Sequence, residues 1–251
     1  MKHLHLKQMI VLPLTLLLLV FCMASCSHRM TPQVSTAATS GTDPVLQTRT
    51  YKEKGYTLTF KNNDPSFDTS IREKLVRTFF IVYPKEARRF NKKVPKSIVF
   101  SMDTAYHGVA ATGHDKTTFS AAYYHKHPHD IDVVTHEVMH IVQGYPHYHP
   151  VWLVEGIADY ARYVYGVHNK TAGWILYDYS DKQSYKNSYR ICARFLVWLS
   201  KNVDKKIVDQ LDSSLRDDTY TSGTWKKLTG KTVDELWAAY GKDPALQLHY
   251  R

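Results

Sequence analysis

The most informative stretch of the sequence is Asp130-Ile-Asp-Val-Val-Thr-His-Glu-Val-Met-His-Ile-Val-Gln143, which contains the pattern HExxH. In a helix, residues four apart lie one turn apart on the same face, so the imidazoles of His136 and His140 can bind one zinc ion. At about 100° per residue, Glu137 lies near this face and the aliphatic residues lie on the opposite side. The stretch therefore predicts an amphipathic helix that directs two histidines and a glutamate into a cleft.

A catalytic zinc site needs a third protein ligand and keeps one position open for water. We favour Glu155, because it lies on the next predicted helix and completes a His₂Glu ligand set. Asp159 follows one turn later on the same face, where its carboxylate can accept the second ring N–H of a zinc-bound histidine. Asp159 and His147 are the alternative third ligands.

One class of zinc peptidases, the metzincins, is excluded by spacing. Its pattern HExxHxxGxxH would place glycine at position 143 and histidine at position 146, where this chain has Gln143 and Pro146. Gly144 and His147 miss those positions by one residue each. The class also needs a later methionine turn, and the sequence has no methionine after Met139.

Residues 1–26 have the features of an export signal. Two lysines precede an apolar run, Ile10–Met23, that is shorter than the roughly twenty residues of a bilayer span. The run ends in Met23-Ala-Ser-Cys26, which resembles a bacterial lipobox. We expect a lipoprotein signal peptide with lipidation at Cys26, and an ordinary signal peptide cleaved near the same place is the alternative. The lipid would anchor the exported protein to a membrane of the bacterial cell envelope.

Residues 27–50 are expected to be a flexible tether, because residues 28–50 contain no aromatic side chain and are rich in Thr, Ser and Ala. One folded domain should follow over residues 51–251. After processing, Cys192 is the only cysteine that could be a free thiol in this domain. It lies in an apolar stretch of helical periodicity, which predicts a small buried residue.

The composition supports a packed domain and argues against nucleic-acid binding. Hydrophobic residues make up 43% of the 251 residues and aromatic residues 13%, which is too much for a disordered chain. The formal net charge of +10 favours anionic surfaces such as lipid headgroups. The basic residues are nevertheless scattered and do not gather with aromatic residues, so no nucleic-acid partner is expected.

Hydrophobic periodicity predicts strands first and helices afterwards. Strands are expected at Tyr56–Phe60, Ser97–Met102 and Lys116–Tyr124, the last with Phe119, Ala121 and Tyr123 on one face. Helices are expected near residues 71–83, 130–143, 151–165, 188–200 and 203–216, and a last helix from the capping box at Thr232 to Gly241. This order indicates an α+β fold with an N-terminal mixed sheet and a helical C-terminal half.

Several separated motifs resemble the basic secretory protein family of plants and bacteria. They are Asn62–Asp68, His107–Ala111, Asp130–Gln143, Trp152–Arg162 and Ala193–Trp198. The resemblance extends over nearly all of Tyr51 to Tyr240, and the motifs occur in the family's order. It implies a zincin-like metallopeptidase domain with His136, His140 and Glu155 as zinc ligands and Glu137 as the catalytic residue.

The expected chemistry is peptide hydrolysis at one zinc ion per chain. Glu137 would take a proton from the zinc-activated water and later deliver it to the leaving amine. The strand Lys116–Tyr124 could bind an extended peptide as an added strand. Tyr185 and Tyr189 are candidates for stabilising the oxyanion, with a packing or surface role as the alternative for each.

A second hypothesis is a lipid-anchored surface protein that keeps this scaffold and binds peptides or glycans through its eighteen tyrosines, without turnover. The complete His–Glu–His set together with Glu155 favours the enzyme. The His-rich segment with His125, His127 and His129 could contact substrate or a second metal, and an exposed polar turn is the alternative. Neither hypothesis specifies an oligomeric state.

Overall fold

The computed structural model describes residues 33–34 and 47–251. The expected signal peptide with Cys26, and most of the expected tether, lie outside these described residues. Within them, none of the helices combines the length and the apolar character that crossing a membrane requires.

The described strands form one mixed sheet in the order β1-β2-β3-β4-β6-β5. They are β1 (Gln33–Val34), β2 (Gln47–Glu53), β3 (Tyr56–Asn62), β4 (Ser97–Asp103), β5 (Ala110–Gly113) and β6 (Lys116–Ser120). Strands β3, β4 and β6 run parallel, whereas β1–β2, β2–β3 and β5–β6 are antiparallel pairs. The short strand β5 therefore forms one edge of the sheet.

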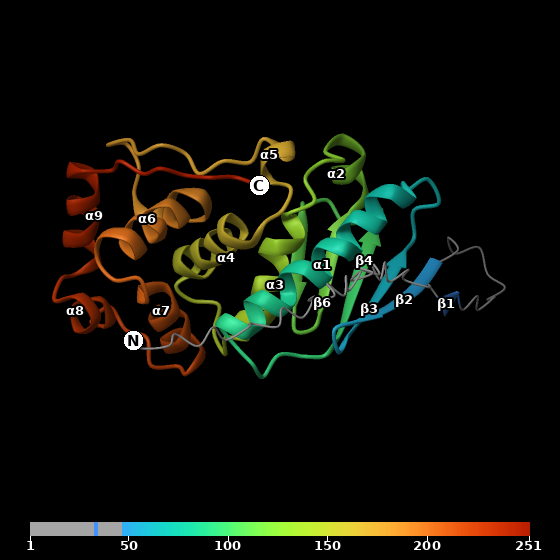
Figure 1. The fold of residues 1–251 in the computed structure, drawn as a ribbon, viewed down its shortest axis with the longest axis horizontal. Helices are drawn as coiled ribbons and strands as arrows, with labels where there is room; N and C mark the ends of the chain where they lie inside the picture. The colour runs from blue at the N-terminus through green and yellow to red at the C-terminus, as the bar shows by residue number, and fades with distance from the viewer. Residues whose placement is uncertain (1–32, 35–46) are drawn as a thin grey trace, which may run out of the picture. The chain divides into compact units, whose positions relative to one another are not determined.

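One face of the sheet is buried under a long helix, α1 (Thr69–Arg89), which crosses it in Figure 1. Along β3 and β4, buried side chains alternate with half-buried ones, as in a sheet that packs on one face only. Phe79 of α1 packs edge-to-face on Phe100 of β4, with ring centroids 5.5 Å apart. Because α1 connects the parallel strands β3 and β4, it is the crossover helix of a βαβ unit.

The C-terminal half is helical, as the sequence predicts. Its elements are α2 (Ala121–Lys126), α3 (Val133–Gln143), α4 (Val151–Tyr165), α5 (Asn169–Ala172), the 3₁₀ turn η1 (Tyr185–Asn187), α6 (Tyr189–Asn202), α7 (Ile207–Arg216), α8 (Thr224–Thr229) and α9 (Val233–Lys242). In Figure 1, α3 and α4 lie between the sheet and the later helices, and α6 packs against α4, α7 and α9. The fold class is thus confirmed, and the capping box of Thr232 and Glu235 is present at the start of α9.

Two of the boundaries that differ from the sequence-based expectation concern strands. The strand expected over Lys116–Tyr124 ends at Ser120, whose side chain accepts a hydrogen bond from Tyr123 N (3.2 Å) and caps helix α2. Ala121 and Tyr123 are therefore helical, because the serine N-cap overrides the short alternating pattern. Strand β2 begins at Gln47, within the last four residues of the expected tether, and pairs along its whole length with β3.

Candidate metal centre

Helix α3 carries both histidines of the HExxH pattern and is held at both ends. At its start, the buried Asp132 accepts hydrogen bonds from Thr135 Oγ1 (2.8 Å) and from Val167 N (3.1 Å), which follows the end of α4. At its end, Gly144 has a φ of 51°, a left-handed conformation that glycine adopts without steric cost. The Asp132 contacts thus link α3 to the chain that follows α4.

Helix α4 carries Glu155 and Asp159 one turn apart, and it crosses α6 at very short range. A Cβ atom at Gly156 would lie 2.2 Å from Cys192 Sγ, so only glycine fits at this crossing. Cys192 is fully buried with a free thiol, which confirms the prediction from its apolar surroundings. The contact between Gly156 and Cys192 therefore fixes the position of the adjacent Glu155.

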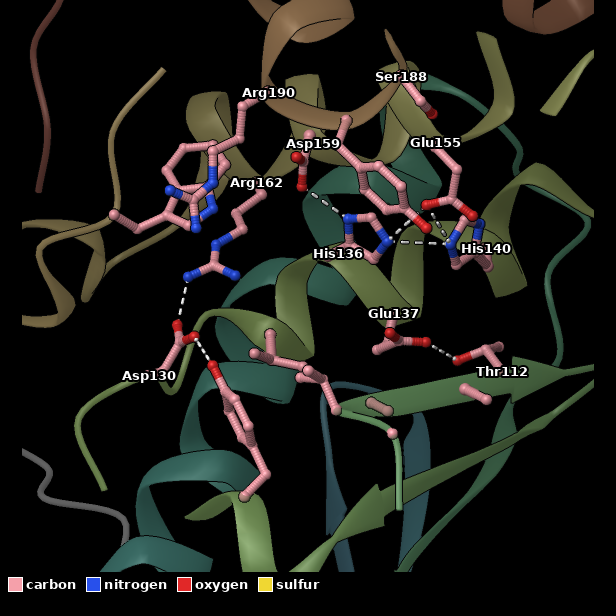
Figure 2. A pocket seen from close by; sticks show the side chains of 18 of the residues that line it. Thr112, Asp130, His136, Glu137, His140, Glu155, Asp159, Arg162, Ser188 and Arg190 are labelled. Atoms are coloured by element: carbon pink, nitrogen blue, oxygen red, sulfur yellow. Dashed lines mark hydrogen bonds and ion pairs between the residues drawn. The ribbon is translucent and has the colours of Figure 1, made fainter. Parts of the chain in front are cut away.

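The structure brings together the three predicted ligands, as Figure 2 shows. His136 Nε2 lies 3.2 Å from His140 Nε2 and 3.1 Å from Glu155 Oε2. His140 Nε2 lies 3.7 Å from the same carboxylate oxygen. One donor atom from each residue lies within 4.8 Å of the others, which is compact enough for a single ion.

The second ring nitrogen of each imidazole, Nδ1, is held by a hydrogen bond to a neighbouring side chain. His136 Nδ1 donates to Asp159 Oδ1 (2.8 Å), because an ionised carboxylate can only accept. His140 Nδ1 lies 2.7 Å from Gln143 Oε1, and Gln143 Nε2 donates to Val154 O (2.9 Å). This second bond fixes the orientation of the amide, so His140 Nδ1 also donates. When both imidazoles are neutral, their Nε2 lone pairs face the same point.

A buried carboxylate that faces two imidazole nitrogens favours a cation at the centre of the arrangement. Glu155 Oε2 is buried and accepts no hydrogen bond of good geometry from the described residues. Burial lowers the pKa of His136, but the adjacent carboxylates of Asp159 and Glu155 outweigh burial and raise this pKa to about 10. Burial and the charge of His136 lower the pKa of His140. In the metal-free protein the cation is thus a proton on His136, and a His₂Glu donor set fits zinc in its place.

Glu137 lies beside the ligands and receives a hydrogen bond from the edge strand β5. Thr112 Oγ1 donates to Glu137 Oε2 (2.7 Å) and lies 2.9 Å from Thr117 Oγ1 of β6. Glu137 and the three candidate ligands line a cavity of about 780 Å³, here called the central cavity. A cavity of this size accommodates several residues of a peptide.

The two tyrosine candidates, Tyr185 and Tyr189, lie in different surroundings. Tyr189 lines the central cavity, where its half-exposed ring stacks over His136 with centroids 6.1 Å apart. Tyr185 does not line this cavity: its hydroxyl donates to Asp234 (2.8 Å) and its ring packs on Trp152. The structure therefore places Tyr185 in the helical core, which fits its alternative packing role, and does not bring it beside the candidate ligands.

The other predicted histidines lie away from the candidate ligands. His147 is largely exposed and lies 3.7 Å from Asp218, so the structure does not bring this alternative ligand to His136, His140 and Glu155. His125 pairs with Asp64 at 2.7 Å, whereas the ring of His127 packs against Tyr123. Within the described part of the chain, the His-rich segment does not form a second metal cluster.

Three further residues contact the site and were not singled out from the sequence. They are Thr112, which binds Glu137; Gln143, which holds His140; and Tyr148, whose exposed ring lies 5.8 Å from His140. The spacing of Gln143, three residues after His140 on the same helix, is a signal that could have identified it. Thr112 and Tyr148 come from a strand and a loop whose positions depend on the tertiary fold.

Residues 49–240 match the family described as peptidase of plants and bacteria, BSP. The chain belongs to this family. The match agrees with the resemblance to the basic secretory proteins and covers the sheet, the candidate ligands and the helical half. None of the curated proteins compared with the chain matches it.

Solved structures support the zincin-like fold. Aminopeptidase A of Legionella pneumophila, in complex with aspartic acid, matches with a TM-score of 0.55 at 14% identity, over 77% of this chain and 28% of that one. The M1 zinc metallopeptidase of Deinococcus radiodurans matches with a TM-score of 0.53 at 13% identity, over 80% of this chain and 53% of that one. A mutant of the latter, bound to a Tyr-Ser-Ala substrate, has a TM-score of 0.50 at 13% identity, with the same two coverages. The chain thus spans from about a quarter to about half the length of these relatives.

Proposed function

We propose that the protein is a zinc-dependent peptidase of the bacterial cell envelope. His136, His140 and Glu155 would hold one zinc ion, and Glu137 would act as the general base. The observation that carries the proposal is the convergence of two imidazole Nε2 atoms and a buried carboxylate oxygen beside Glu137. Membership of a peptidase family and a fold shared with zinc metallopeptidases support it.

Each residue of the site has a distinct task in this proposal. Zinc, when bound, would lower the pKa of a water molecule and polarise the carbonyl of the peptide bond. Glu137 takes the proton of that water on its carboxylate and returns it to the leaving amine nitrogen. Asp159 and Gln143 keep the imidazoles oriented. Tyr189, whose ring stacks over His136, would donate a hydrogen bond from its hydroxyl to the developing oxyanion.

A peptide substrate would pair with a different strand from the expected strand Lys116–Tyr124. Strand β6 pairs on both sides, with β4 and with β5, so its backbone has no free edge for a peptide. Strand β5 is the edge strand, and its residues Ala110, Ala111 and Thr112 line the central cavity. We therefore assign the added peptide strand to β5, next to Glu137.

The envelope location rests on the sequence of residues 1–26 alone. The apolar run and Cys26 predict lipidation, and a lipid at that position would attach the catalytic domain to a membrane through the segment that precedes β2. Peptides or proteins of the envelope would then be its substrates.

Glu137→Gln tests the proposed chemistry, because it keeps the shape of the side chain and all three ligands. Zinc should stay at about one ion per chain, while digestion of an unbiased peptide library slows by about 10²–10⁴-fold. Glu53→Gln, at the end of β2, is the matched control and should leave both unchanged. Equal turnover by Glu137→Gln would remove this residue from the mechanism. A zinc-loaded wild-type chain that cleaves nothing in the library would favour a binding protein on the same scaffold.

A further inference from the structure

The central cavity extends beyond the candidate ligands to a second group of side chains around Trp174. Arg162 of α4, Arg190 of α6 and Trp174 line this part of the cavity. Figure 2 shows both arginines beside Asp159 on the His136 side of the site, with His140 on the other side. Neither arginine has a task in the hydrolytic chemistry described above.

Arg162 is rigidly held and still has a free donor. The residue is only 5% exposed, and it donates from Nε to Asn169 Oδ1 (3.1 Å) and from Nη2 to Asp130 Oδ1. Tyr123 OH donates to the other oxygen of Asp130 (2.5 Å), which fixes that carboxylate. Among the described residues, nothing accepts a hydrogen bond from Arg162 Nη1. A buried guanidinium is thus oriented with one N–H-bearing nitrogen unused.

Arg190 is positioned by aromatic rings rather than by an acid. Its Cζ lies 5.3 Å from the ring centroid of Trp174 and 5.1 Å from that of Tyr177, and its Nη1 donates to Tyr177 OH (2.9 Å). Arg162 Cζ also lies over Trp174, at 4.6 Å. No carboxylate of the described chain forms an ion pair with Arg190, whereas Asp130 pairs with Arg162. The charge of Arg190 is therefore unmatched.

An unmatched guanidinium that is already stacked in a concave site is suited to bind a carboxylate. Its planar donor fork matches the two oxygens of a carboxylate, and stacking reduces the conformational entropy lost on binding. We propose that Arg190, assisted by Arg162 Nη1, forms a subsite that binds a carboxylate of the peptide substrate. This inference rests on the proposed peptidase function. The carboxylate can be an acidic side chain or the C-terminus of the peptide.

Binding measurements separate this subsite from catalysis. The full chain carrying Glu137→Gln and loaded with zinc is titrated with dansyl-labelled hexa-alanine peptides, amidated at the C-terminus, that contain one glutamate at each position in turn. Peptides with glutamine at the same positions are the neutral partners. An all-alanine peptide with a free C-terminus, compared with its amide, distinguishes the C-terminal source from the side-chain source.

At one glutamate position, or with the free C-terminus, binding should be about ten- to a hundredfold tighter than for the neutral partner, the usual range for hydrogen bonds to a charged group. Arg190→Gln should abolish this ratio while affinity for the neutral peptides changes less than about twofold. Arg190→Glu should reverse the preference in favour of lysine at that position. Arg77→Gln, which removes an exposed arginine of α1 outside the cavity, should preserve the ratio.

The other possible results distinguish between the subsite and the peptidase proposal. Equal binding of charged and neutral peptides, or a preference that survives Arg190→Gln, overturns the subsite and leaves the peptidase proposal intact. A preference that depends on Arg190, in a wild-type chain that cleaves no peptide, supports the subsite and overturns the peptidase proposal. If none of these peptides binds, the subsite is overturned, and digestion of the unbiased peptide library still decides the peptidase proposal. Thermal unfolding of each variant shows whether a loss of preference reflects a loss of folded protein.

Discussion

Thr112 Oγ1 donates a hydrogen bond of 2.7 Å to Glu137 Oε2, which joins the edge strand β5 to the metal helix α3. The bond holds one carboxylate oxygen of Glu137 and leaves the other available to a proton. The proposed substrate strand β5 and the proposed general base Glu137 are thereby linked through the side chain of Thr112. This relationship leads to the first prediction.

Thr112→Val keeps the shape of the side chain and removes the hydroxyl. We expect kcat to fall by about tenfold. One hydrogen bond to a charged group is worth roughly 1.5–3 kcal/mol, and the variant should lose only the part of this energy that orients the Glu137 carboxylate. Zinc content should be unchanged, since Thr112 does not contact a ligand residue. Thr117→Val, which removes the neighbouring hydroxyl of β6, should have a smaller effect. An equal loss in both variants would indicate a packing role instead.

The candidate ligands should rank in a definite order of zinc affinity. Glu155→Ala should lose zinc nearly completely, since two imidazoles alone hold the ion weakly against a chelator. Asp159→Asn should bind zinc about 10–100-fold more weakly, as expected for a residue that orients His136. His147→Ala should match the wild type. Competition with a chromogenic chelator measures all three, and zinc retained without Glu155 would contradict the ligand assignment.

Zinc binding should release a proton at mildly acidic pH. The pKa of His136 is raised in the metal-free protein, so this imidazole is protonated there and must lose its proton before Nε2 can bind a metal. His140, with its lowered pKa, is already neutral and releases none. At about pH 6.5, below the pKa of a typical zinc-bound water, calorimetry in buffers of different ionisation enthalpy should find about one proton per zinc. Zinc affinity should accordingly weaken as the pH falls. A count near zero protons per zinc would contradict the displacement of a proton from His136.

The anchoring proposal is tested at Cys26. Cys26→Ala should abolish incorporation of labelled fatty acid and shift the protein from the membrane fraction to the soluble fraction of a bacterial host. Cys192→Ala is the control, because this cysteine is buried in the folded domain and should not be lipidated. Continued labelling of Cys26→Ala would contradict the lipobox interpretation.

The sequence predicted what depends on local periodicity. His136, His140 and Glu155 could be placed on inward faces because a helix has a fixed angle per residue, and the structure brings those three side chains together. Cys192 could be placed in the core for the same reason. Asp159 supports a histidine in the way that its one-turn offset from Glu155 predicts.

Features that depend on long-range pairing or on unusual backbone could not be predicted. Thr112 reaches Glu137 only because β5 pairs with β6, which the sequence of either strand does not specify. The pair of tyrosines near α6 separates because Ser188 and Tyr189 both have positive φ, 67° and 45°. That reversal directs Tyr189 into the central cavity and leaves Tyr185 in the core, whereas a regular helix start would have kept them on neighbouring faces.

The close contact of α4 and α6 at Gly156 and Cys192 makes the reactivity of the Cys192 thiol a measure of how well these two helices stay packed. Cys192 is inaccessible to solvent, and burial raises the pKa of its thiol well above the usual range. An alkylating reagent can therefore reach it only when the two helices separate, which also displaces Glu155. The rate of thiol modification thus measures how often α4, which carries Glu155, separates from α6. The same experiment with and without zinc reports how strongly a bound ion would keep the two helices together.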